Sequence, residues 1–161
     1  MTTRLTPGAL FTGKFLSGIF RGFVQTFILL ILAYAVFRFF TPATFLETLL
    51  IALVFAAAAS AIGLLIAVLV RTEAAGTWVA VFVTMAMTML GGTFFPIGQD
   101  SAWSTLSKIS INTYANDAVK SVLLKGRGLQ DIGGDLAVLA FVAIAGFLAS
   151  RILFRVAPGG K

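Results

Sequence analysis

The sequence predicts an all-α polytopic membrane protein with four transmembrane helices. A short external pair of amphipathic or re-entrant helices lies between spans three and four. Three observations support this fold class. Hydrophobic residues make up 59% of the 161 residues and charged residues only 11%, against roughly 25% charged in soluble domains. Four apolar segments reach the length of about 20 residues that a bilayer requires. A half-polar segment, residues 96–131, separates the last two of them.

The first span is predicted at residues 15–40, behind a cytoplasmic segment at residues 1–14. Arg21 and Arg38 lie near its ends, and the centre between them is uncharged. The centres of the other spans also lack Asp, Glu, Lys and Arg. Such residues cost about 2.5 to 3.5 kcal/mol in a bilayer and are usually functional where they occur. The sequence therefore argues against a proton-coupled antiporter, a proton relay or a voltage sensor.

The second span is predicted at residues 49–70, which carry no charge. Phe40-Thr41-Pro42 precedes it, and proline and its predecessor disfavour a continued helix. Small residues fill its centre from Ala56 to Ala61 and again at Gly63. Small residues at four-residue spacing let helices approach closely. This pattern fits either helix packing within the chain or a subunit interface.

The third span is predicted at residues 74–95, after a short charged turn that contains Arg71 and Glu73. One face of this span is more polar and more polarisable than the rest. It carries threonine and methionine side chains at helical spacing: Thr84, Met85 and Thr88. Two interpretations stay open. The threonine hydroxyls bond to carbonyls of their own helix, or the face lines a substrate path.

Residues 96–131 read as two short helices outside the spans. Asp100 or Ser101 can cap the first, and Asn112 or Thr113 can cap the second. Lys125-Gly126 is typical of a helix C-terminus. The apolar residues recur at steps of three and four: Trp103, Leu106, Ile109, and then Ile111, Tyr114, Ala115, Ala118, Val122. Such helices either lie at the membrane interface or tuck into the mouth of the bundle, and Trp103 and Tyr114 suit headgroup depth.

The fourth span is predicted at residues 136–157, with Arg151 and Arg155 reaching back to the interface. Four spans put both termini on one side of the membrane. Of the 12 Lys and Arg residues, seven fall in segments on that side and five on the other. Because basic residues accumulate on the cytoplasmic side, both termini are predicted to be cytoplasmic.

Several kinds of chemistry are disfavoured by composition. The chain has no Cys and no His, which excludes thiolate or imidazole metal sites and Ser-His-Asp triads. Gly8 to Lys14 matches a phosphate-binding loop, but Phe15 follows where a hydroxyl is needed and no strand precedes it. The net charge of +6 sits at the ends of apolar segments, so phospholipid headgroups are the expected partner rather than nucleic acid.

Three stretches then resemble the permease (transmembrane) subunits of type-2 ATP-binding-cassette (ABC) exporters. They are Thr6 to Lys14 leading into Gln25, Leu90 to Pro96, and Tyr114 to Lys120 followed by Gly126. They occur in order across nearly the whole chain. The resemblance begins after the family's second span, so it implies either a fragment or a permease whose first two spans come from another polypeptide.

The resemblance implies a transport protein of the bacterial cytoplasmic membrane that forms part of a substrate path. A separate ABC ATPase subunit would bind ATP and magnesium, so the permease itself needs no cofactor. A second permease subunit, identical or different, would enclose the path. The residues implied to contact the ATPase are Arg4, Thr6, Pro7 and Lys14, with Arg71 and Glu73 at the second cytoplasmic turn. The implied external gate comprises Gly91, Gly92, Phe94, Phe95, Pro96, Trp103 and Tyr114.

One alternative function remains open on the sequence. A small, non-transporting accessory or assembly protein could stabilise a partner by helix packing. A membrane-embedded enzyme is disfavoured, since acid–base and nucleophilic groups are scarce in the spans.

Overall fold

The structure is a computed structural model that describes residues 7–37, 41–70, 72–93 and 102–156. These ranges form six helices and no strand: α1 (Pro7–Phe37), α2 (Pro42–Leu69), α3 (Glu73–Leu90), α4 (Ala102–Ser107), α5 (Ile111–Lys125) and α6 (Gly133–Val156). Helices α1, α2, α3 and α6 are long and apolar enough to cross a membrane. The predicted fold class is confirmed.

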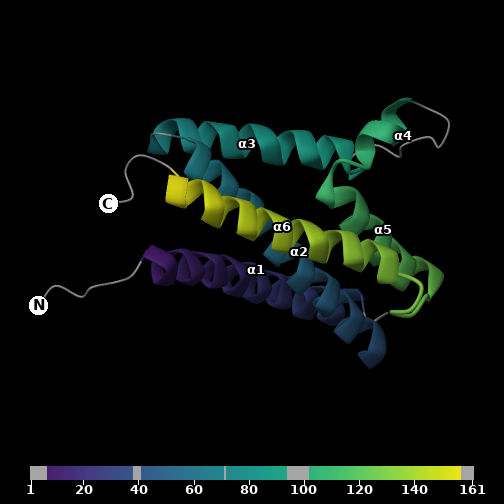
Figure 1. Ribbon diagram of the computed structural model, residues 1–161. Coiled ribbons are helices and arrows are strands. Elements are labelled where there is room, and N and C mark those ends of the chain that lie inside the picture. The colour runs from purple at the N-terminus through teal and green to yellow at the C-terminus, as the bar shows by residue number, and fades with distance from the viewer. Residues whose placement is uncertain (1–6, 38–40, 71, 94–101, 157–161) are drawn as a thin grey trace, which may run out of the picture.

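The four long helices run roughly side by side, with α2 at the centre (Figure 1). Helix α2 packs most extensively against α6, α1 and α5, whereas α3 stands away from the bundle. We call the end where α1 begins, α6 ends and α2 turns into α3 the terminal side. We call the opposite end, where α1 leads to α2 and α5 leads to α6, the loop side.

Helix α1 begins at Pro7, well before residue 15 where the span was predicted to start. Residues 7–14 are therefore its first two turns and not a separate segment. Proline is favoured at the first helical position. Phe11 then anchors these turns to α6, with its ring centroid 5.4 Å from that of Phe154 and 6.3 Å from that of Phe147.

Small residues bring α1 and α6 close to α2. A Cβ added to Gly22 would lie 2.9 Å from the Cβ of Ala56, and one added to Gly146 would lie 3.0 Å from that of Ala61. Ala58 and Ala61 are fully buried inside the chain. Of the two interpretations of these small residues, the structure therefore shows packing within the chain.

The contact between Gly22 and Ala56 also shows how far along the helix bundle Arg21 lies. Ala56 lies near the midpoint of α2, so Arg21 stands level with the middle of the most apolar span. The prediction that the centre of the first span is uncharged is wrong. The reason is the early start of the helix: 31 residues extend about 46 Å, which moves Arg21 away from the end of the helix.

Helix α5 tucks into the loop side of the bundle. At its N-terminal end, Ile111 packs against Ala58, Leu139 and Ala143. Nearer its C-terminal end, Ala118 and Val122 pack against Ile51 and Ile132. Because Ala58 lies deeper along α2 than Ile51 does, α5 rises from the middle of the bundle to the loop side, where Gly126 ends it with a positive φ of 60°. The predicted apolar face and C-terminus of this helix are confirmed.

Candidate functional site

A crevice runs along the length of α3, between it and α2. Its terminal half has a volume of about 580 Å³ and its loop half about 380 Å³. Gly63, Ile66 and Ala80 line both halves, so the two are continuous. Among the described lining residues, the charged side chains are Lys14 and Glu73, both in the terminal half. The crevice is therefore polar at its mouth and mostly apolar within.

Helix α3 leaves this crevice open because it packs weakly. Thr72 caps its start, accepting a hydrogen bond from the amide of Ala75 at 3.3 Å. None of the residues from Glu73 to Leu90 is buried. The helix is thus fixed at its two ends, by the turn from α2 and by contacts with α4 and α5, while its middle faces the crevice on one side.

The structure separates the three predicted path residues. Thr84 and Thr88 line the crevice, whereas Met85 is outside the lining and its side chain is 64% exposed. The hydroxyl of Thr88 donates to the carbonyl of Thr84 at 2.7 Å. Thr88 therefore bonds to its own helix, as the first interpretation expected, and its side chain also lines the crevice.

The start of α5 closes the crevice on the loop side. The hydroxyl of Ser110 donates to the carbonyl of Met87 at 2.7 Å, and the amide nitrogen Nδ2 of Asn116 donates to the carbonyl of Gly91 at 3.0 Å. The side-chain nitrogen Nδ2 of Asn112 donates to the hydroxyl of Thr88 at 3.2 Å. The last carbonyls of a helix lack partners within it, and here Asn116 of α5 supplies one for Gly91, while Ser110, the N-cap of α5, adds a second bond to the Met87 carbonyl, which also accepts from the amide of Gly91.

Gly91 and Gly92 make this close junction possible. A Cβ on Gly91 would lie 2.6 Å from the Cβ of Asn112. Gly92 has a φ of 64°, in the left-handed region that favours glycine. The described helix ends at Leu90, before the predicted end at residue 95, because these two glycines turn the chain. Phe94, Phe95 and Pro96 lie outside the described residues.

Tyr114 packs into the bundle rather than standing alone at the surface. It contacts the buried cluster around Ile111, and its hydroxyl donates to the carbonyl of Lys108 at 3.0 Å. The side chain of Trp103, the other predicted interfacial aromatic, lies outside the described part of the chain.

Sequence reasoning missed the polar side chains that join α5 to α3. Asn112 or Thr113 was expected to cap α5, but Ser110 does so, accepting from the backbone amide of Asn112 at 3.2 Å. The side chain of Asn112 is thereby free to reach Thr88. Ser110, Thr113 and Asn116 recur at steps of three, and that polar stripe opposite the apolar face was the available signal.

Of the six residues predicted to contact the ATPase, the structure brings two together. Lys14 of α1 and Glu73 of α3, far apart in sequence, both line the mouth of the crevice. Pro7 begins α1. Arg4, Thr6 and Arg71 lie outside the described residues.

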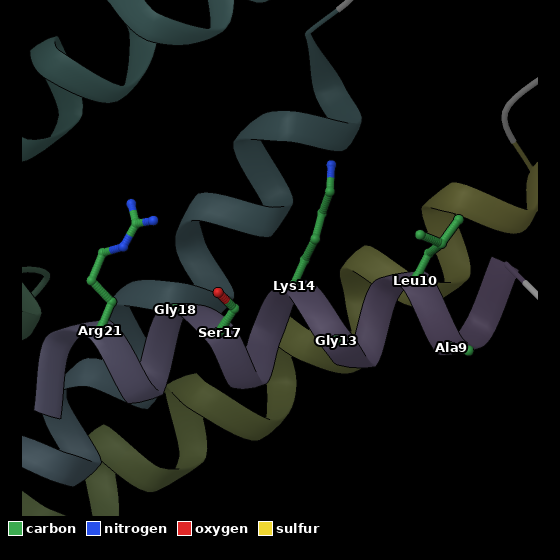
Figure 2. A pocket seen from close by; sticks show the side chains of 7 residues that line it. All are labelled: Ala9, Leu10, Gly13, Lys14, Ser17, Gly18 and Arg21. Carbon is green, nitrogen blue, oxygen red and sulfur yellow. The ribbon is translucent and has the colours of Figure 1, made fainter. Parts of the chain in front are cut away.

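A second hollow, of about 530 Å³, lies along α1 itself. Gly13, Ser17 and Gly18 form part of its lining, and Lys14 and Arg21 extend from the helix on the same side (Figure 2). Lys14 lines both this hollow and the mouth of the crevice. Lys14 therefore connects the α1 hollow to the crevice, whereas Arg21 lines the hollow alone.

Comparison with known protein families gives a match. The family model of the ABC-2 type transporter matches residues 1–124, which include the three stretches that carried the resemblance up to the last residues of α5. No curated protein and no solved structure matches the chain. With four helices of membrane-spanning length and this match over most of its length, the protein is an integral membrane permease belonging to the ABC-2 type transporter family.

Proposed function

We propose that this permease forms part of the substrate path of an ATP-driven exporter, and that the path follows the crevice between α2 and α3. The crevice itself is the observation that carries this proposal. It extends from Lys14 and Glu73 on the terminal side to Ile111 and Asn112, where α5 closes it. A route open at one end and closed at the other is what one state of an alternating-access transporter requires.

The proposed orientation places the open end of the crevice in the cytoplasm, where an exporter loads its substrate. With Arg21 at mid-span, six Lys and Arg residues remain on the terminal side against five on the loop side, and this excess favours placing the terminal side in the cytoplasm. The crevice would then be open to the cytoplasm and closed to the outside. A substrate loaded from the cytoplasm would leave when α5 and the end of α3 move apart.

A separate ABC ATPase would supply the work, binding ATP and magnesium itself. It would contact the first turns of α1 and the turn between α2 and α3. Because Lys14 and Glu73 from these two segments line one mouth, closure of the ATPase would change the width of that mouth. A second permease subunit, identical or different, would complete the path.

Reversing the charge at Lys14 tests this coupling. In cells that express the permease with an epitope-tagged ABC ATPase, Lys14→Glu should reduce co-purification of the ATPase several-fold, because a cation at the contact is replaced by an anion. The amount of permease in the membrane should not change.

The matched control is Lys120→Glu, which makes the same reversal at an exposed lysine of α5 on the loop side. It should leave co-purification unchanged. Equal recovery of the ATPase with wild type and Lys14→Glu would remove Lys14 from the coupling contact.

A further inference from the structure

Arg21 is an exposed cation at the depth where a membrane protein least tolerates one. Its neighbour Gly22 packs against Ala56, near the midpoint of α2. An arginine at that depth costs about 2.5 to 3.5 kcal/mol on insertion scales, and such residues pair with an opposite charge or line a functional path. The side chain of Arg21 therefore calls for an anionic partner.

Lys14 stands on the same face of α1, two turns towards the terminal side. Seven residues of helix separate the two cations by about 10 Å along the axis. Figure 2 shows both side chains extending to the same side of the helix, above the hollow that Gly13, Ser17 and Gly18 help to line. Because these floor residues are small, the space of about 530 Å³ beside the two cations stays open.

This chain supplies a carboxylate near Lys14, because Glu73 also lines the crevice mouth, but it supplies none at the depth of Arg21. None of the described residues that line the hollow is acidic. The whole sequence has six acidic residues, all at the ends of the spans or in the segment between α3 and α6: Glu47, Glu73, Asp100, Asp117, Asp131 and Asp135. For the same reason, a second copy of the chain could not place a carboxylate at the depth of Arg21.

We propose that Lys14 and Arg21 bind the phosphate-bearing headgroup of an anionic, lipid-like amphiphile, whose apolar chain occupies the crevice between α2 and α3. Guanidinium and ammonium groups form charge-assisted hydrogen bonds with phosphate oxygens, and arginine can do so with two parallel bonds. Lys14 belongs to both the hollow and the crevice mouth, so a headgroup held there would leave its chain at the crevice.

The crevice suits such a chain in length and polarity. From Glu73 to Thr88 the α3 wall extends about 22 Å. The lining of its loop half is dominated by apolar side chains, including Phe55, Ile62 and Val83. This assignment names the substrate class of the path, and in that respect it rests on the proposed function.

Lipid association can be measured on the permease alone. The purified protein is reconstituted in phosphatidylcholine vesicles that contain a trace of spin-labelled phosphatidylglycerol or spin-labelled phosphatidylcholine. The fraction of motionally restricted label is then read by electron paramagnetic resonance. Wild type should restrict phosphatidylglycerol several-fold more than phosphatidylcholine, because only the former has a net negative headgroup.

In Arg21→Gln the motionally restricted fractions of the two labelled lipids should become nearly equal. Lys14→Gln should reduce the preference for phosphatidylglycerol. Arg21→Lys should retain part of it, because the charge remains. The control is Arg151→Gln, an exposed arginine near the terminal end of α6 that does not line the hollow. It should keep the full preference.

Four outcomes would overturn the site. Wild type could show no preference for phosphatidylglycerol, or Arg151→Gln could lose the preference as fully as Arg21→Gln. Millimolar inorganic phosphate could displace the labelled lipid, which would indicate a site for a small anion. If Arg21→Gln instead released a co-purifying membrane protein without changing lipid restriction, an acidic partner helix would be the occupant.

The outcome is separable from that of the coupling experiment, because neither ATPase nor ATP is present. Suppose that wild type prefers phosphatidylglycerol while Lys14→Glu recovers as much ATPase as wild type does. The lipid site would then stand, and the coupling contact would fail. Loss of the preference in wild type with intact coupling would leave the exporter without this substrate class.

Discussion

At the scale of single residues, glycines and alanines set how closely the helices pack. Gly22 meets Ala56, and Gly146 meets Ala61, at distances that leave no room for another methyl group. The sequence predicted close approach around Ala56 to Ala61. It could not say which helices would use the small residues, because that depends on how α1 and α6 settle on α2.

Adding one methyl group at Gly22 tests this packing. Gly22→Ala would place a Cβ 2.9 Å from that of Ala56, and such overpacking typically costs about 1 to 3 kcal/mol. We expect a lower midpoint of thermal unfolding in detergent, measured by loss of the monodisperse peak in size-exclusion chromatography after heating.

Gly13→Ala is the matched control, on the same helix. Nothing lies within 4 Å of a Cβ added there, so the midpoint should stay at or above that of wild type. A fall of the same size in both variants would attribute the effect to glycine replacement in general rather than to the contact with Ala56.

Arg21 shows a limit of reading depth from sequence. Counting apolar residues from Phe15 placed Arg21 near the end of the span. The contacts of Phe11 with α6 extend the helix back to Pro7, and the Gly22–Ala56 contact brings Arg21 level with mid-span. Both are contacts between distant parts of the chain, which no local pattern contains.

At the scale of elements, the junction of α3 with α5 governs the loop side. The apolar periodicity of residues 111–122 correctly predicted an amphipathic α5. It left open whether this helix lies at the membrane interface or packs into the bundle. The structure shows that α5 packs into the bundle, against α2 and α6. The end of α3 could not be predicted from its apolar run, because that run continues to Phe95 in the sequence.

Asn116 tests the junction without removing the cap of α5. In Asn116→Ala, the carbonyl of Gly91 and the hydroxyl of Thr93 lose their common donor. An unpartnered carbonyl away from water costs about 1 to 3 kcal/mol. We therefore expect faster hydrogen–deuterium exchange at the end of α3 and the start of α5.

Asp117→Ala serves as control, since Asp117 is the exposed neighbour of Asn116 on the same helix. Its exchange pattern should match wild type. Unchanged exchange in Asn116→Ala would show that these two bonds do not hold α3 to α5.

At the scale of the whole molecule, the order and number of spans were predictable because the bilayer imposes a length and a polarity on each one. The family was predictable as well, because three short stretches in order carried it. The crevice was not. It exists because α3 packs against the bundle chiefly through its ends, and Thr84 and Thr88 were identified by spacing without knowledge of the wall that faces them.

The most direct test of ATP-driven transport along the crevice is the water accessibility of a cysteine within it. The chain has no native cysteine, so a Thr84→Cys variant carries a single thiol in the crevice wall. A Phe82→Cys variant carries one on α3 outside the described lining, where the native side chain is 74% exposed and would face lipid. Each variant is reconstituted with its ATPase and treated with a membrane-impermeant maleimide on the terminal side.

We predict that Thr84→Cys reacts readily without nucleotide and several-fold more slowly once ATP and magnesium are added. Phe82→Cys should react slowly in both conditions. A Thr84→Cys thiol that never reacts from the terminal side, or that reacts at the same rate with and without ATP, would contradict an ATP-driven path between α2 and α3.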